Sequence, residues 1–465
     1  MLTDILNQID GYVWGPWLLV LLVGTGVWLT LRLSLIQVLK LPRALRLIFF
    51  ARNKGNGDID SFKALCTALA ATVGTGNIVG VATAIKLGGP GALFWMWLAA
   101  FFGMATKYAE GCLAVKYRSV DDQGHVAGGP MYYIEMGLGK KWKPLAAAFS
   151  IFGVMTAMLG NGTTTQMNAI TASVQAGFGI SAYVTCAIIT ILVAIITFGG
   201  LRSIAKTASK IVPGMAVVYF IITVLFLGYN AGELPHAVAL VIDGAFNGTA
   251  AAGGFAGAGI MLVMRSGIAR GLYSNESGLG SAPIVAAAAK TKWPAEQGLI
   301  SMTGTFIDTI IICTLTGLTI IVSGVWTGDL NGAELTQAAF ASTYGGFAPI
   351  ILTVSLTLFA FTTIIGWNYY GERCWEYLFG TKTITLYRIC YIAVLASAVF
   401  LKLEAIWALA DIVNGLMAIP NLIALLGLSG VIAAETKKYF TYLSIRDAKL
   451  KAYKEKQATR GIIEE

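Results

Sequence analysis

Residues 72–80 read TVGTGNIVG, which places three glycines and three polar side chains inside an otherwise apolar segment. The segment around them, residues 62–86, is long and apolar enough to be a membrane-spanning helix, and the run lies near its middle. Glycine costs about 1 kcal/mol in a helix interior, and a backbone group exposed to lipid costs several kcal/mol more. We therefore expect the helix to be interrupted here, with its backbone facing a cavity or a ligand.

The whole chain has the composition of an integral membrane protein. Its 465 residues are 56% hydrophobic and 12% charged, and the mean hydropathy is +0.72. Because the apolar runs are continuous rather than alternating, the spans should be helices and not barrel strands. The sequence predicts an all-α fold with eleven transmembrane helices. The expected spans are 14–35, 62–86, 92–115, 144–173, 182–200, 211–229, 252–273, 297–324, 346–370, 383–401 and 404–428.

The net charge of +9 indicates topology rather than nucleic-acid binding. If residues 40–54 are cytoplasmic, the later basic clusters all fall on the same side, and only Lys86 and Lys402 lie at the opposite face. The positive-inside rule then places the N-terminus outside the cell membrane and the C-terminus in the cytoplasm. The basic tail at 437–465 is expected to lie against anionic lipid, and no nucleic-acid partner is expected.

Motifs of catalysis are missing from the sequence. The two histidines, His125 and His236, lie in predicted loops, and the six cysteines show no paired spacing. HExxH and GxSxG motifs do not occur, so an enzyme is disfavoured. A channel would need a continuous polar pore, whereas the polar residues gather at isolated points. We expect a carrier with no cofactor and no metal other than a transported ion.

A second weak point, GTAAAGGFAGAG at 248–259, opens the seventh predicted span with five glycines. Counted from the second span, the two weak points fall in the first and sixth of ten helices. This spacing is typical of two five-helix repeats of inverted topology whose first helices are discontinuous. The connection at 274–296 is expected to hold short interfacial helices. The expected units are a helix and linker at 1–61, repeats at 62–229 and 230–436, and the tail at 437–465.

Broken helix ends can bind both charges of an amino acid. Amides at a half-helix N-terminus can hold a carboxylate, while freed carbonyls can hold an ammonium group or Na⁺. An amino acid therefore fits better than a sugar or an anion, and we assign Gly76, Gly254 and Gly257 to the substrate site. The alternative is that the glycines serve helix packing. For the first break we favour binding, because helix packing does not need polar side chains beside the glycines. Thr72 is one of these polar side chains, and we assign it no specific role.

Other polar and aromatic residues in the spans have two interpretations each. Gln166 is expected to reach the substrate, with an interhelical hydrogen bond as the alternative. Asp308 lies halfway along its span, where it either anchors the fold or binds a coupling ion, and we favour the anchor. Trp367 and Phe255 are candidates to close the pocket over a small side chain, with packing as the alternative.

Four blocks of the sequence are similar to those of a known family. GGPGALFWMWLAAFFG at 88–103 closely resembles the signature of the alanine or glycine:cation symporters, also called sodium:alanine symporters. TVGTGNIVG at 72–80, AGGPMYYIEMGLG at 127–139 and GLYSNESGLGSAP at 271–283 look like further blocks. The resemblance covers essentially the whole chain and implies a leucine-transporter type of fold with Na⁺- or H⁺-coupled uptake of alanine or glycine. Transport of another small solute, such as a nucleobase, is the alternative.

The resemblance also implies roles for individual residues. Carried over by position, Thr75, Gly76 and Asn77 contribute to the amino acid site. In folds of this type a Na⁺ ion bridges the first broken helix and the eighth core helix, and Na⁺ prefers oxygen ligands. The ligands implied here are the hydroxyls of Thr362 and Thr363 and the carbonyls of Ala70 and Val73. The alternative for each threonine is a hydrogen bond to its own helix.

Overall fold

The computed structural model describes the chain except for residues 1, 52–54, 248–258, 401–402 and 462–465. The fold is all-α, as predicted, with one short hairpin formed by β1 (Ser119–Val120) and β2 (Val126–Ala127). The helices before residue 230 are α1 (Leu2–Val13), α2 (Pro16–Arg32), α3 (Ile36–Leu39), α4 (Leu41–Phe50), α5 (Ser61–Thr72), α6 (Val79–Gly88), α7 (Gly91–Lys116), α8 (Pro130–Tyr133), α9 (Lys143–Leu159), α10 (Thr164–Phe178), α11 (Ala182–Phe198) and α12 (Gly200–Tyr229). The later helices are α13 (Leu234–Asn247), α14 (Ile260–Asn275), α15 (Ala282–Ala286), α16 (Pro294–Thr305), α17 (Thr314–Val322), α18 (Gly332–Tyr344), α19 (Ala348–Phe379), α20 (Ile384–Ser397), α21 (Leu403–Gly427) and α22 (Ser429–Gly461).

The chain is a multi-pass membrane protein. Within the described ranges, 7 helical segments are long and apolar enough to cross a membrane, or 8 with α5 and α6 counted as one bent span. Three further expected spans correspond to α7, α11 and α14. These three helices are not among the 7 segments for different reasons. Charged residues make α7 less apolar, α11 has only 17 residues, and α14 begins directly after residues that lie outside the described part. The count of eleven therefore stays a prediction.

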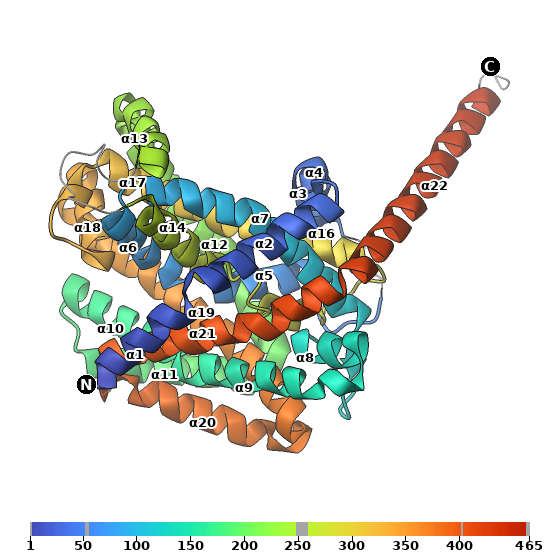
Figure 1. Ribbon diagram of the computed structural model, residues 1–465, viewed down its shortest axis with the longest axis horizontal. Coiled ribbons are helices and arrows are strands. Elements are labelled where there is room, and N and C mark those ends of the chain that lie inside the picture. Colours follow the sequence, from blue (N-terminus) through green and yellow to red (C-terminus); the bar gives the residue numbers. More distant parts are fainter. Residues whose placement is uncertain (1, 52–54, 248–258, 401–402, 462–465) are drawn as a thin grey trace.

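The helices pack in two groups on either side of α5 and α6. In one group, α7 packs against α14 and α16, and α14 also packs against α6. In the other group, α9 and α10 pack against α19, and α11 packs against α20. The helix α12 contacts both α5 and α19. Figure 1 shows α22 projecting from this body at the end opposite to the N-terminus.

The first predicted interruption is confirmed. The helix α5 ends at Thr72, a 3₁₀ turn called η1 covers Thr75–Asn77, and α6 begins at Val79. The axes of the two halves differ by 64°. Every residue from 69 to 78 is buried, so the unwound backbone faces protein and not lipid.

The described part of the second half of the chain contains a break that the sequence did not predict. The glycine run at 248–259 falls almost entirely outside the described residues, and nothing is concluded about it. The described chain unwinds after α14, where Glu276, Gly278 and Gly280 have φ angles of 55°, 90° and 83°. The expectation of interfacial helices at 274–296 is wrong for residues 274–289, which are all buried. Polar residues and glycines that suggested a connection on the cytoplasmic side instead form a buried turn.

The packing of α7 on α16 depends on Gly298, where a Cβ atom would lie 2.7 Å from the carbonyl oxygen of Tyr108. We expect Gly298→Val to lower the free energy of unfolding by about 1–3 kcal/mol. The added side chain would clash with the backbone of α7, which can shift only if the packing between the two helices is disturbed. Thermal unfolding of the purified protein in detergent measures this loss. Gly24→Val is the matched control, since a Cβ at Gly24 meets no atom within 4 Å. Equal losses in both variants would contradict a tight contact.

Candidate functional site

The side chain of Asn77 replaces a backbone carbonyl at the first break. The amide of Gly74 donates to Asn77 Oδ1 at 2.9 Å, and the amide of Asn77 donates to the carbonyl of Gly74 at 3.3 Å. In a continuous helix these two amides would donate to the carbonyls of Ala70 and Val73. Both carbonyls therefore lose their helical donors. They lie at the C-terminal end of α5, where partial negative charge favours a cation.

The beginning of α6 has the opposite polarity. The amides of Thr75 and Gly76 donate no hydrogen bond within the described part of the chain. They lie just before α6, so the partial positive charge of a helix N-terminus favours an anion there. The broken helix therefore offers unpaired acceptors and unpaired donors within a few residues of each other.

The glycines of the first break also allow neighbouring helices to come close. A Cβ at Gly74 would lie 2.4 Å from Thr363 Oγ1 on α19, and one at Gly76 would lie 3.1 Å from Ser274 Cα on α14. The packing role that we weigh against binding thus has a direct geometric basis. The two roles are compatible, because the same closeness brings side chains from α14 and α19 to the exposed backbone.

Asp308 connects the first break to the end of α14. Its Oδ1 accepts from Asn77 Nδ2 at 2.8 Å, and its Oδ2 accepts from Ser274 Oγ at 2.9 Å and from Thr309 Oγ1 at 2.8 Å. The carboxylate is fully buried in η6, a π-helical segment at Phe306–Cys313. Three donors offset the cost of burying it. These contacts are the ones that the anchor interpretation requires.

Gln166 lies in the first turn of α10 and reaches the break from the other group of helices. Its Nε2 donates to Thr75 Oγ1 at 3.2 Å. Its Oε1 is buried and has no hydrogen-bond partner among the described residues. A buried acceptor without a partner is costly. The structure therefore places a free acceptor next to Thr75, where a bound ammonium group could use it.

The two threonines assigned to sodium differ in their surroundings. Both hydroxyls donate to the carbonyl of Phe359 at 3.0 Å, so the alternative of bonding to their own helix is realised in this geometry. Thr363 Oγ1 also lies 3.5 Å from the carbonyl of Val73, at the end of α5. Thr362 Oγ1 instead lies 3.7 Å from the sulfur of Met215 on α12. Thr363 is thus brought to the break, and Thr362 is not.

Sequence reasoning missed Glu276, which lies at the break after α14. Its Oε1 accepts from Trp367 Nε1 at 3.0 Å, its Oε2 accepts from Ser281 Oγ at 2.5 Å, and its carbonyl accepts from Lys107 Nζ at 3.2 Å. Trp367 is buried and supports this turn. Phe255, the other aromatic candidate, lies outside the described residues, as do Gly254 and Gly257.

Glu110 on α7 holds the rest of the second break. Its Oε1 accepts from the amides of Gly278 and Gly280, both at 3.1 Å, and from Asn421 Nδ2 at 2.7 Å. The positive φ angles of the two glycines turn their amides toward one carboxylate. The signal in the sequence was the motif SNESGLG, in which a glutamate and two glycines interrupt a buried segment.

A cavity of about 160 Å³ lies beside the first break on the α6 side. An adjoining cavity of about 190 Å³ shares Arg270 and Tyr273 with it and also contains Asp10 and Asp411. Arg270 Nη1 lies 3.7 Å from Asp411 Oδ2 in the wall of this second cavity. On the α5 side, the cavity that includes Thr72 has only about 10 Å³. The break is therefore more open from the α6 side.

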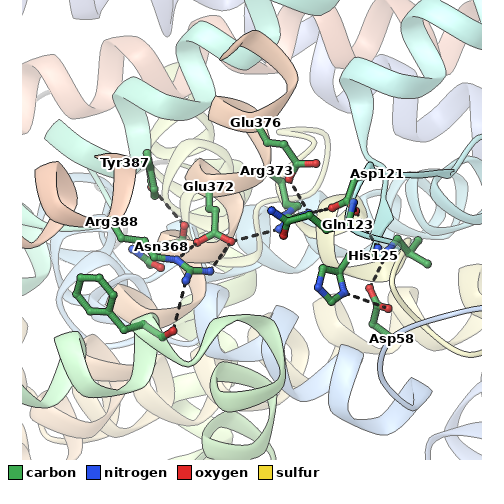
Figure 2. A network of polar contacts seen from close by, with 12 residues as sticks. Asp58, Asp121, Gln123, His125, Asn368, Glu372, Arg373, Glu376, Tyr387 and Arg388 are labelled. Atoms are coloured by element: carbon green, nitrogen blue, oxygen red, sulfur yellow. Dashed lines mark hydrogen bonds and ion pairs between the residues drawn. The ribbon is translucent and has the colours of Figure 1, made fainter. Parts of the chain in front are cut away.

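Figure 2 shows a network of buried ion pairs near Asp58, which precedes α5 and accepts a hydrogen bond from the amide of Val126 in β2. Arg373 on α19 lies 3.2 Å from Asp121 in the β1–β2 turn, 2.6 Å from Glu376 and 3.2 Å from Glu372. Arg388 on α20 lies 2.6 Å from Glu372. These pairs join the hairpin to α19 and α20, and all of these carboxylates are at most 4% exposed.

The sequence model of the sodium:alanine symporter family matches residues 1–454. The chain belongs to the sodium:alanine symporter family. The family resemblance that we read from 88–103 is thereby confirmed, and the protein is a secondary transporter and not an enzyme.

Relatives of this symporter-family protein match it over nearly their whole lengths. An uncharacterized transporter of Haemophilus influenzae is 56% identical over 444 residues, which cover 95% of this chain and 97% of the relative. The sodium/alanine symporter AgcS of Methanococcus maripaludis is 50% identical over 446 residues, with coverage of 94% and 97%. The probable sodium/glutamine symporter GlnT of Bacillus subtilis is 38% identical over 447 residues, with coverage of 94% and 91%.

A solved structure with a similar fold is the manganese transporter of Eremococcus coleocola. It superposes with a TM-score of 0.51 over 81% of each chain, at 12% sequence identity. At this identity the likeness concerns the fold alone. It supports the helical fold of the chain.

The contacts of Asp308 predict that it is needed for stability. Asp308→Ala should lower the free energy of unfolding by about 2–4 kcal/mol, because Asn77 and Ser274 would keep buried donors without an acceptor. Asp308→Asn should lose less, since its amide oxygen still accepts one bond. Thermal unfolding in detergent measures both variants. Asp243→Ala on the exposed side of α13 is the control, and a loss at Asp308 no larger than at Asp243 would exclude the anchor.

Proposed function

We propose that this family member couples Na⁺ entry to the uptake of alanine, glycine or a similar small amino acid by alternating access. The observation that carries the proposal is the α5–α6 break, where the freed carbonyls of Ala70 and Val73 lie close to the free amides of Thr75 and Gly76. A cation and a carboxylate fit these two ends. The unpartnered oxygen of Gln166 fits an ammonium group. The 50% identical relative named as a sodium/alanine symporter supports this choice of substrate.

Coupling in this proposal arises because the ion and the amino acid share one broken helix. An ion between the carbonyl of Val73 and Thr363 Oγ1 would bind α5 to α19, with Ala70 as a further ligand. Thr362 would have to turn away from Met215 to join them. An amino acid on the α6 side would order the same residues from the other end. Binding of each ligand then strengthens binding of the other by the same factor.

Alternating access requires a closure at each end of the site. We assign the Arg270–Asp411 pair to the outer mouth and the Arg373 network to the inner end. In this geometry the inner end is the more tightly closed. Opening it requires the bonds between Arg373 and Asp121 to break, which separates the hairpin from α19.

The orientation in the membrane follows from the basic residues. We propose that the N-terminus lies outside the cell membrane and that the basic helix α22 lies in the cytoplasm. Arg265 and Arg270 on α14 are then outer residues in addition to Lys86, because α14 carries them beside Asp10 and Asp411 in the outer cavity.

The helix contacts support two inverted repeats at 62–229 and 230–436. In that assignment, the first four helices of one repeat are α5–α6, α7, α9–α10 and α11. The first four helices of the other repeat are α14, α16–α17, α19 and α20. Each helix packs against its counterpart: α6 on α14, α7 on α16, α10 on α19 and α11 on α20. A pseudo-twofold axis between the repeats produces this pairing. We therefore keep eleven membrane-spanning helices as the proposed count.

The proposed function is tested by uptake of labelled alanine into proteoliposomes, with an inward Na⁺ gradient compared with a K⁺ gradient. Na⁺-driven accumulation that unlabelled glycine suppresses, and that leucine and uracil do not, is the expected result. Suppression by uracil alone would favour the nucleobase alternative. Accumulation driven by a proton gradient without Na⁺ would replace Na⁺ by H⁺ as the coupling ion.

The ion site predicts unequal effects of the two threonines. Thr363→Ala should raise the Na⁺ concentration for half-maximal uptake about tenfold, which corresponds to the loss of one ligand. Thr362→Ala should raise it less, because its hydroxyl lies on Met215. Uptake at varied Na⁺ measures both, and size-exclusion chromatography checks that each variant is folded. An unchanged Na⁺ dependence in Thr363→Ala would remove Thr363 from the ion site.

A further inference from the structure

A cleft of about 490 Å³ is lined by residues of α4, α16 and α22. Figure 1 shows α22 leaving the helical body beside α16. One wall is α4, the opposite wall is α22, and the start of α16 contributes Glu296. The cleft shares no lining residue with the cavities beside the α5–α6 break. Its lining residues are Pro42, Arg43, Arg46, Leu47, Phe50, Glu296, Tyr439, Leu443 and Arg446.

The charged groups of this cleft are mainly positive. Arg43 and Arg46 come from α4 and Arg446 comes from α22, against a single lining carboxylate, Glu296. Glu296 already accepts a hydrogen bond from Tyr439 at 3.1 Å. Arg46 has no ion-pair partner among the described residues. The cleft therefore has more guanidinium groups than carboxylates. A guanidinium group can donate two parallel hydrogen bonds to a phosphate, which a lysine ammonium group cannot do.

An exposed carboxylate at the rim shows how the guanidinium groups are spaced. Asp447 Oδ2 lies 3.8 Å from Arg43 Nη2, and Asp447 Oδ1 lies 2.8 Å from Arg446 Nη2. One anionic group thus bridges arginines from two different helices. The side chain of Asp447 is 53% exposed, and exposed ion pairs are weak. A second anion can therefore displace it.

The remaining walls of the cleft are apolar and lie at the level of the membrane surface. Glu296 is in the first turn of the apolar segment Pro294–Val322, which is long enough to cross the membrane. On α4, Phe49 and Phe50 are 74% and 72% exposed. Phe50 lines the cleft on the same face of α4 as Arg43 and Arg46. A short helix that carries arginines and exposed aromatic rings is typical of a helix at the membrane surface.

We propose that the cleft between α4 and α22 binds the headgroup of an anionic phospholipid. Arg43, Arg46 and Arg446 bind the phosphodiester, and the acyl chains run along the exposed rings of Phe49 and Phe50. A tail that only lies on a negative membrane would use the scattered lysines of α22. The cleft instead defines one site, which joins α22 to the segment that leads into α5.

The test is a titration of the purified protein in detergent, followed by native mass spectrometry, with phosphatidylglycerol, phosphatidylcholine and sn-glycerol 3-phosphate. Phosphatidylglycerol should be retained most tightly. Replacing Arg43, Arg46 and Arg446 together with glutamine should weaken its binding at least about tenfold, given the contribution of each basic residue near anionic lipid. Lys140, Lys141 and Lys382 are exposed residues of the same charge elsewhere, and their triple glutamine variant should change binding by less than about twofold.

A single substitution gives an independent check in the opposite direction. Asp447→Asn removes the competing carboxylate and should strengthen phosphatidylglycerol binding about threefold. Equal weakening in the arginine and lysine variants would show diffuse attraction and overturn the site. Binding of sn-glycerol 3-phosphate as tight as that of the lipid would show a site for soluble phosphate instead. Melting temperatures without lipid confirm that every variant is folded.

Discussion

The hydrogen bond from the Gly74 amide to the side chain of Asn77 is the interaction on which the rest of the site depends. An unpaired backbone group is costly in a membrane, so the groups that an opened helix frees need a ligand or a protein group that replaces the lost carbonyl. Asn77 does this and leaves the carbonyls of Ala70 and Val73 without helical donors. Asp308 holds Asn77 in place and also binds Ser274 of α14. One carboxylate thereby couples the first break to the helix that ends in the second.

The second break follows the same rule with different groups. Its backbone amides at Gly278 and Gly280 are satisfied by Glu110, and the carbonyl of Glu276 is satisfied by Lys107. Both partners come from α7, which therefore acts as a support for the unwound turn. The chain belongs to the sodium:alanine symporter family, and secondary transporters commonly build their binding sites from discontinuous helices. Fixed partners on a neighbouring helix keep such an unwound turn ordered.

The sequence predicted the first break but not the break after α14, and the reason is physical. At Gly74 and Asn77 the interruption is local, because glycines and a short amide side chain lie within one turn of helix. At Glu276 the turn is held mainly by Glu110, Lys107 and Trp367, which are distant in the sequence. Polar residues at 276–281 were therefore interpreted as part of a cytoplasmic connection. The difference between Thr362 and Thr363 could likewise not be predicted from the sequence. It depends on which threonine faces α5 and which faces α12.

The central claim is that sodium and the amino acid share the α5–α6 break, and equilibrium binding tests it most directly. The measurement is the Kd of alanine for the purified wild-type protein at several Na⁺ concentrations, with K⁺ keeping the ionic strength constant. The account predicts that Na⁺ lowers the Kd of alanine, and that alanine lowers the Na⁺ concentration for half-saturation by the same factor. A Kd for alanine that is the same in Na⁺ and in K⁺ would contradict it.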